Sequence, residues 1–153
     1  MKITHVENLE TTPMPVGSKN PLVPGCGTHH VAVQTRDWNS SLRLYQEVLG
    51  MQPVAEFGPA ERRIMLLDAG DGSHIELFQP TNDTPLPGGP SPNDPVTHIA
   101  LATTDARTAI EHVRSHGYEV TIEPKEVNLG GLEVTVAFFK GPCGEVIEFF
   151  QEH

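Results

Sequence analysis

The chain has 153 residues, a length that fits one ordinary domain or two very small ones sharing a core. Hydrophobic residues make up 37% of it, which is enough for a globular core and excludes a disordered chain. Its 20 acidic against 10 basic residues give a net charge of −10. That balance argues against nucleic acid or a membrane surface as the partner, but not against a small anionic ligand. Without a signal peptide or a long apolar run, the expectation is a soluble cytoplasmic protein.

Two segments rich in proline and glycine frame the parts expected to fold. Residues 1–27 are predicted to form an extended N-terminal arm, and residues 80–95, which contain TNDTPLPGGPSPNDP, a linker. This division predicts a first module over residues 28–79 and a second over residues 96–153.

The two modules resemble each other, which indicates an internal repeat. His30 and His98 take matching places 68 residues apart, and the same offset separates Asp37 from Asp105. The copies end in similar segments, SHIELFQ and EVIEFFQ. The pattern in each copy is a strand, a helix and three more strands.

In chain order, the first copy is expected to hold a strand at 30–35, a helix at 37–49 and strands at 51–57, 63–68 and 73–79. The second copy is expected to hold a strand at 97–103, a helix at 105–116 and strands at 118–123, 132–139 and 145–151. Each helix has an acidic residue near its start, and Gly50 and Gly117 mark the two ends. The predicted fold is α+β, with two tandem βαβββ modules.

Strand alternation places one histidine and one glutamate of each copy on the face away from the helix. His30 and His98 are followed on that face by small residues, and Glu76 and Glu148 take corresponding places on the last strands. Two imidazoles and two carboxylates supply four ligands for one divalent metal ion, such as Zn²⁺, Ni²⁺, Co²⁺, Mn²⁺ or Fe²⁺. On an octahedral ion, two positions would stay open for substrate oxygens.

The segments HVAVQTRDWNSSLRLYQEVLGM and GPCGEVIEFF resemble the opening and closing units of the vicinal oxygen chelate superfamily, which includes glyoxalase I, bleomycin resistance proteins and extradiol dioxygenases. The resemblance implies a curved mixed sheet around a metal-binding cup. It also implies His30, Glu76, His98 and Glu148 as the metal ligands, a set similar to that of glyoxalase I. The family's spacing before the acidic helix start implies His30 rather than His29. One departure is the loop GPCGE, where many relatives carry an aspartate.

The activity that the resemblance implies is that of a metal-dependent lyase, isomerase or epimerase of the glyoxalase I type. Such an enzyme transfers a proton next to a carbonyl through a metal-stabilised enediolate. Glu148, or Glu76 on the opposite side of the substrate, would be the general base. Two alternatives stay open: an extradiol-like dioxygenase, whose usual iron site has one carboxylate, and a non-catalytic protein that binds a small molecule.

Four further residues are candidates for contacts with a small-molecule substrate. Arg62 and Arg63 precede a strand and have the geometry to bind a carboxylate or a phosphate. His74 shares a strand face with Glu76, and Gln34 shares one with the first histidine. Because relatives are commonly dimers, a homodimer is expected, with the site within one chain or across the dimer.

Overall fold

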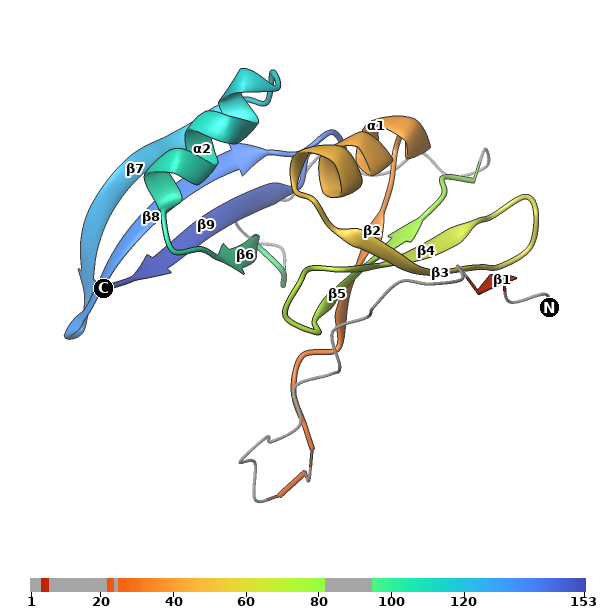
Figure 1. Ribbon diagram of the computed structural model, residues 1–153, viewed down its shortest axis with the longest axis horizontal. Helices are drawn as coiled ribbons and strands as arrows, with labels where there is room; N and C mark the ends of the chain where they lie inside the picture. The colour runs from red at the N-terminus through yellow and green to blue at the C-terminus, as the bar shows by residue number, and fades with distance from the viewer. Residues whose placement is uncertain (1–3, 6–21, 24, 82–94) are drawn as a thin grey trace. The chain divides into compact units, whose positions relative to one another are not determined.

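The computed structural model describes residues 4–5, 22–23, 25–81 and 95–153, and the chain divides into two compact units, residues 1–85 and 86–153. Each unit holds one mixed β-sheet and helical structure (Figure 1). Most of the predicted arm and linker lies outside the described residues. Within the described ranges, no helix combines the length and the apolar character that crossing a membrane requires.

The first unit contains β1 (Thr4–His5), β2 (His30–Gln34), α1 (Trp38–Leu42), the π-helix η1 (Arg43–Val48), β3 (Gln52–Phe57), β4 (Ile64–Asp68) and β5 (His74–Phe78). The strand order in its sheet is β1-β3-β4-β5-β2. The first and last strands of the module, β2 and β5, run parallel, and the other neighbours are antiparallel. The short β1 adds a strand that the sequence did not predict.

The second unit contains β6 (Ile99–Ala102), α2 (Ala106–Ser115), β7 (Val120–Leu129), β8 (Leu132–Lys140) and β9 (Val146–Glu152). Its strand order is β6-β9-β8-β7, and β6 and β9 again run parallel. The prediction of two tandem βαβββ modules is therefore confirmed.

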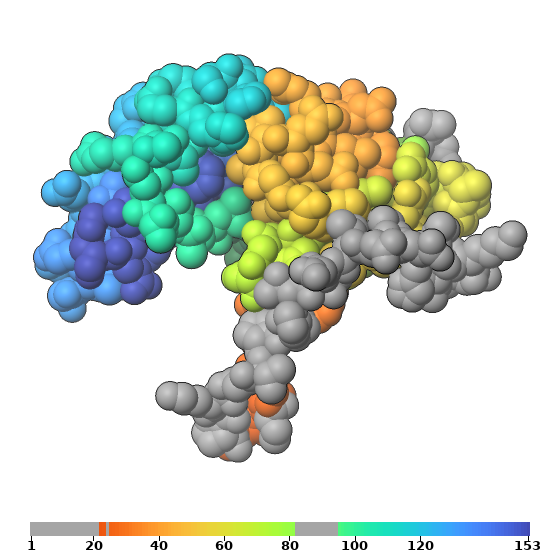
Figure 2. All heavy atoms as spheres, in the orientation of Figure 1, coloured from red at the N-terminus to blue at the C-terminus, as the bar shows by residue number. Residues whose placement is uncertain are grey.

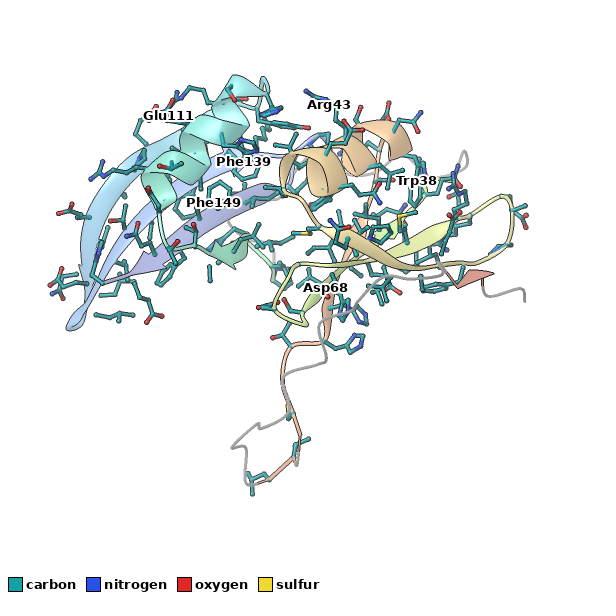
Figure 3. All side chains as sticks on the ribbon, viewed as in Figure 1. Trp38, Arg43, Asp68, Glu111, Phe139 and Phe149 are labelled. Carbon is teal, nitrogen blue, oxygen red and sulfur yellow. The ribbon has the colours of Figure 1, made fainter. Side chains whose placement is uncertain are left out.

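One face of each sheet carries the apolar core. In the first unit this face buries Val33, Met65, Leu67, Ile75 and Leu77, and Gln46 of η1 reaches Met65. In the second unit, Phe139 and Phe149 stack at a ring distance of 5.4 Å and lie between α2 and its sheet (Figure 3). The atoms of α2 lie directly against those of the strands in the space-filling view (Figure 2). The opposite face of each sheet is left for other contacts.

The first helix differs from the single helix predicted over 37–49. After α1 the backbone widens into η1, and the Leu49 N–H donates to the carbonyl of Leu44, five residues back, at 2.8 Å. The extra residue in this turn helps to bring Leu44, Tyr45 and Val48 into the core together. The predicted end is confirmed, because Gly50 follows with φ of 73°, a conformation that glycine adopts without strain.

Strand β7 runs six residues beyond the predicted end at Glu123. Pro124 lies inside it, although proline has no backbone N–H to donate. The strand is at the edge of its sheet, and its register with β8 shifts between Ile122 and Lys125. An irregular edge position is where a strand tolerates proline.

The acidic residue expected near the start of the second helix, Asp105, is the N-cap of α2. The carboxylate of Asp105 accepts hydrogen bonds from the N–H of Thr108 at 2.9 Å and from its hydroxyl at 2.6 Å, and these bonds lower the pKa of Asp105. A lowered native pKa means that this residue stabilises the fold above the ordinary aspartate range of about 4, and that the contribution is lost as the pH falls through the native value.

We therefore expect Asp105→Ala to lower the midpoint of urea unfolding at pH 7 and to lose most of that difference in acid. The control is Asp105→Asn, which keeps an oxygen acceptor at the cap. An equal difference between wild type and Asp105→Ala at pH 7 and pH 3 would contradict this role.

Candidate metal-binding site

In the first unit, the parallel pairing of β2 with β5 brings a histidine and a glutamate together. The register sets Ala32 beside Glu76, so His30, two residues earlier on β2, shares the face of that glutamate. His30 Nε2 lies 3.4 Å from Glu76 Oε2. The two side chains are 40% and 15% exposed, so the pair is accessible from solvent mainly through the imidazole.

The second unit repeats the arrangement through the pairing of β6 with β9. Ala100 lies beside Glu148, and His98 Nε2 lies 3.0 Å from Glu148 Oε2. Phe138 of β8 pairs with Glu148 across the sheet, and its ring meets that of His98 edge to face at 5.4 Å. The predicted partners thus come together in both units, each at the same place in its module.

The two glutamates differ in their surroundings. The side chain of Glu148 is only 7% exposed, less than half the value for Glu76. Burial raises the pKa of Glu148, while the nearby His98 lowers it by charge and by its hydrogen bond. Glu148 is therefore a partly desolvated carboxylate that faces an imidazole.

Each pair offers one nitrogen and one oxygen donor, which suits a borderline divalent metal. Neither unit, in its described residues, brings three or more His, Cys, Asp or Glu side chains together as a metal site. Each unit thus brings together two of the four predicted ligands. The donor types fit a divalent ion, because an imidazole nitrogen and a carboxylate oxygen about 3 Å apart can occupy neighbouring positions on one metal.

Arg62 and Arg63, although adjacent in sequence, make their contacts on opposite faces of the first sheet. Arg62 donates to Gln34 Oε1 at 3.3 Å, and its guanidinium lies 5.2 Å from the centre of the Phe78 ring. Gln34 and Phe78 are on the face of the first pair, so two of the four predicted substrate contacts come together there. Arg63 instead pairs with Glu56 at 2.5 Å, on the opposite face, where Glu56 lies beside the buried Met65.

Arg63 also lies over the ring of Trp38, at 5.1 Å, on the side of the helix. The indole is buried, and its Nε1 has no hydrogen-bond partner among the residues that the structure describes. The alternation along β4, continued back to residues 62 and 63, predicts this separation, because even-numbered residues of β4 share the face of Glu76.

The other predicted contact, His74, is buried rather than open to a substrate. Its backbone N–H and its Nδ1 both meet the carbonyl oxygen of His29, at 2.9 and 3.0 Å. The rings of His29 and His74 stack at 4.9 Å. His29 is itself exposed and touches His30, a contact that sequence reasoning missed. The signal for it was present, since a polar residue precedes the candidate histidine in both repeats.

Comparison with known proteins agrees with this architecture. The model of the Glyoxalase/Bleomycin resistance protein/Dioxygenase superfamily matches residues 27–149, and the chain belongs to this superfamily. It is 31% identical over 127 residues to the uncharacterized protein YwbC of Bacillus subtilis (strain 168), covering 80% of this chain and 94% of that protein.

Two curated relatives are lactoylglutathione lyases. The chain is 30% identical to that of Haemophilus influenzae, over 80% of this chain and 90% of the relative. It is also 30% identical to that of Arabidopsis thaliana over 80% of this chain, which spans 43% of that longer protein.

Solved structures share the fold at lower sequence identity. A glyoxalase family protein from Enterococcus faecalis superposes with a TM-score of 0.67 and 22% identity, over 82% of this chain and 97% of that one. A glyoxylase/bleomycin resistance protein/dioxygenase domain from Frankia sp. EAN1pec gives a TM-score of 0.70 at 16% identity, over 84% and 98% of the two chains. These likenesses concern the fold alone.

The buried carboxylate gives the second test, on the metal-free protein. A raised native pKa means that Glu148 favours folding below its unfolded pKa and that this contribution is lost as the pH rises through the native value. Between pH 4 and pH 8, wild type should therefore lose stability relative to Glu148→Gln, whose side chain carries no charge. Urea unfolding in the presence of a chelator measures the difference, and parallel pH profiles would contradict the burial argument.

Proposed function

We propose that this protein is a metal-dependent enzyme of the glyoxalase I type, which acts as a lyase, isomerase or epimerase by moving a proton next to a carbonyl. The observation that carries the proposal is the repeated His–Glu pair, formed at the same strand register in both units. The names of the two lactoylglutathione lyases support the same class of reaction.

In this proposal His30, Glu76, His98 and Glu148 hold one divalent metal ion per chain. All four donate through side-chain nitrogen or oxygen, as Zn²⁺, Ni²⁺, Co²⁺, Mn²⁺ and Fe²⁺ accept. When bound, the metal supplies Lewis-acid stabilisation of negative charge that develops on a substrate oxygen.

The residues around each pair prepare the face for a substrate. Ala32 and Ala100 lie beside the glutamates, and their short side chains leave space above the sheet. Phe138 supplies an apolar wall beside His98. We assign the proton transfer to Glu148 rather than Glu76, because its greater burial keeps competing water away from the carboxylate.

The anchor for the rest of the substrate is assigned to Arg62. Phe78, over which its guanidinium lies, is two residues beyond Glu76 on β5, which is about 7 Å along a strand. Gln34 holds the guanidinium from the neighbouring strand. A substrate bound at His30 and Glu76 that carries a carboxylate about 7 Å away would bring that carboxylate to Arg62.

The two alternative functions predict different results in the same experiments. A dioxygenase would consume oxygen when loaded with Fe²⁺ and a catechol, although its usual site has one carboxylate rather than two. A binding protein would return its ligand unchanged. We also expect a homodimer in the cytoplasm. Size-exclusion chromatography with light scattering tests the oligomeric state.

The third test is metal binding and turnover. At a free Zn²⁺ concentration 100 times the dissociation constant, binding should stabilise wild type by about 2.7 kcal/mol. Most of this gain should vanish in His30→Ala/His98→Ala, while the control His116→Ala, at an exposed histidine of the second unit, keeps it.

The metal-loaded protein is then assayed for lactoylglutathione lyase activity. We expect Glu148→Gln to lose turnover while it stays folded. An equal stabilisation by Zn²⁺ in wild type and in the double variant would refute the site.

The fourth test compares the neighbouring arginines. Arg62→Met should raise KM about tenfold, or about 1.4 kcal/mol, for a glutathione-derived substrate, because an ionic hydrogen bond is lost. The substrate's ester, whose carboxylates are capped, should not distinguish the variant from wild type. Arg63→Met should leave KM unchanged and lower the urea midpoint, because it removes the contacts with Glu56 and Trp38. A reversal of these effects would contradict the assignment.

A further inference from the structure

The residue directly before each candidate histidine ligand touches that histidine's other ring nitrogen. His29 Nδ1 lies 2.8 Å from His30 Nδ1. Thr97 Oγ1 lies 3.0 Å from His98 Nδ1. His29 and Thr97 are themselves 68 residues apart, the offset of the internal repeat. The two units thus make the same contact with two different side chains.

This contact occupies the ring nitrogen of each histidine that does not face the glutamate. In both histidines Nε2 is the nitrogen that faces the glutamate, at 3.4 Å in the first unit and 3.0 Å in the second. A neutral imidazole that binds a metal through Nε2 carries its proton on Nδ1 and needs an acceptor there. An imidazole nitrogen and a hydroxyl oxygen are both able to accept that proton's hydrogen bond.

His29 is held for this role by its neighbour on β5. The N–H and the Nδ1–H of His74 both donate to the carbonyl oxygen of His29, and the two rings stack with an angle of 25° between their planes. The ring of His29 then meets that of His30 nearly at right angles, at 87°. The buried His74 therefore fixes both the backbone and the ring of the exposed His29.

In the second unit an aromatic ring contacts the candidate ligand itself rather than the residue before it. Phe138 meets His98 edge to face, and the short hydroxyl side chain of Thr97 needs no stacking partner to stay near Nδ1. His98 is thus contacted by a carboxylate at Nε2, by a hydroxyl at Nδ1 and by the Phe138 ring. His30 is contacted by a carboxylate at Nε2 and by His29 at Nδ1.

We propose that His29 and Thr97 are matched positioning residues, each of which holds Nδ1 of the following histidine so that Nε2 is presented to a metal beside the glutamate. This inference rests on the proposed metal-dependent function and names the residues that prepare its ligands. It also assigns His74 the task of holding His29, in place of the substrate contact expected for it.

The test measures Zn²⁺ affinity by calorimetry and imidazole protonation by two-bond ¹H–¹⁵N spectra of the full chain. His29→Phe keeps a ring to stack on His74 but has no Nδ1, and His29→Asn restores a polar atom near that position. Thr97→Val removes only the hydroxyl, and Thr97→Ser restores it. Thr104→Val, at an exposed threonine of the same unit, is the matched control.

We expect His29→Phe and Thr97→Val each to weaken Zn²⁺ binding by about 10- to 100-fold, the usual effect of losing such a partner. The restoring variants and the control should stay within a few-fold of wild type. In the metal-free spectra, the Nδ1 resonance of His30 should move only in the His29 variants, and that of His98 only in the Thr97 variants.

Zn²⁺ affinity that is unchanged in both His29→Phe and Thr97→Val, with wild type binding the metal, would overturn the positioning role and leave the proposed function standing. Failure of wild type itself to bind Zn²⁺, Ni²⁺, Co²⁺, Mn²⁺ or Fe²⁺ would overturn the proposed function and the positioning role together.

Discussion

The parallel pairing of the first strand with the last strand of each module is the constraint on which both halves of the candidate site depend. It sets Ala32 beside Glu76 and Ala100 beside Glu148, and so carries each histidine to the face of its glutamate. A slip of one residue in either pairing would send every side chain of the strand to the other face. The apolar core resists that slip, because it would expose Leu77 or Ile147, which are fully buried.

The same pairing divides each sheet into a face for stability and a face for chemistry. The fully buried aliphatic and aromatic side chains are gathered under the helices, where burial contributes to folding (Figure 3). The other face carries the His–Glu pairs together with Ala32, Ala100 and the rings of Phe78 and Phe138. A carboxylate as buried as that of Glu148 makes folding less favourable once it is ionised.

Much of this arrangement could be predicted from the sequence, because it depends on periodicity and repetition. Alternation along the strands and the offset between His30 and His98 were enough to predict the modules and to bring each histidine near its glutamate. The π-helix was not predictable in this way, since it depends on how Leu44 and Val48 fill the core rather than on a local pattern. The length of β7 was missed because Pro124 indicates a strand end unless the strand is known to be an edge.

The repeat matters as much where its copies differ as where they agree. Both pairs have the same donors and the same register, yet Glu76 is more exposed than Glu148, and an imidazole supports one histidine where a hydroxyl supports the other. Geometry is set by the shared strand pairing, whereas solvation is set by side chains that each copy can change on its own. For the proposed proton transfer this separation is useful, because two carboxylates with the same geometry acquire different roles only through different surroundings. The repeat thus supplies the symmetry of the proposed four-ligand set, and local substitution supplies the asymmetry that the proposed proton transfer requires.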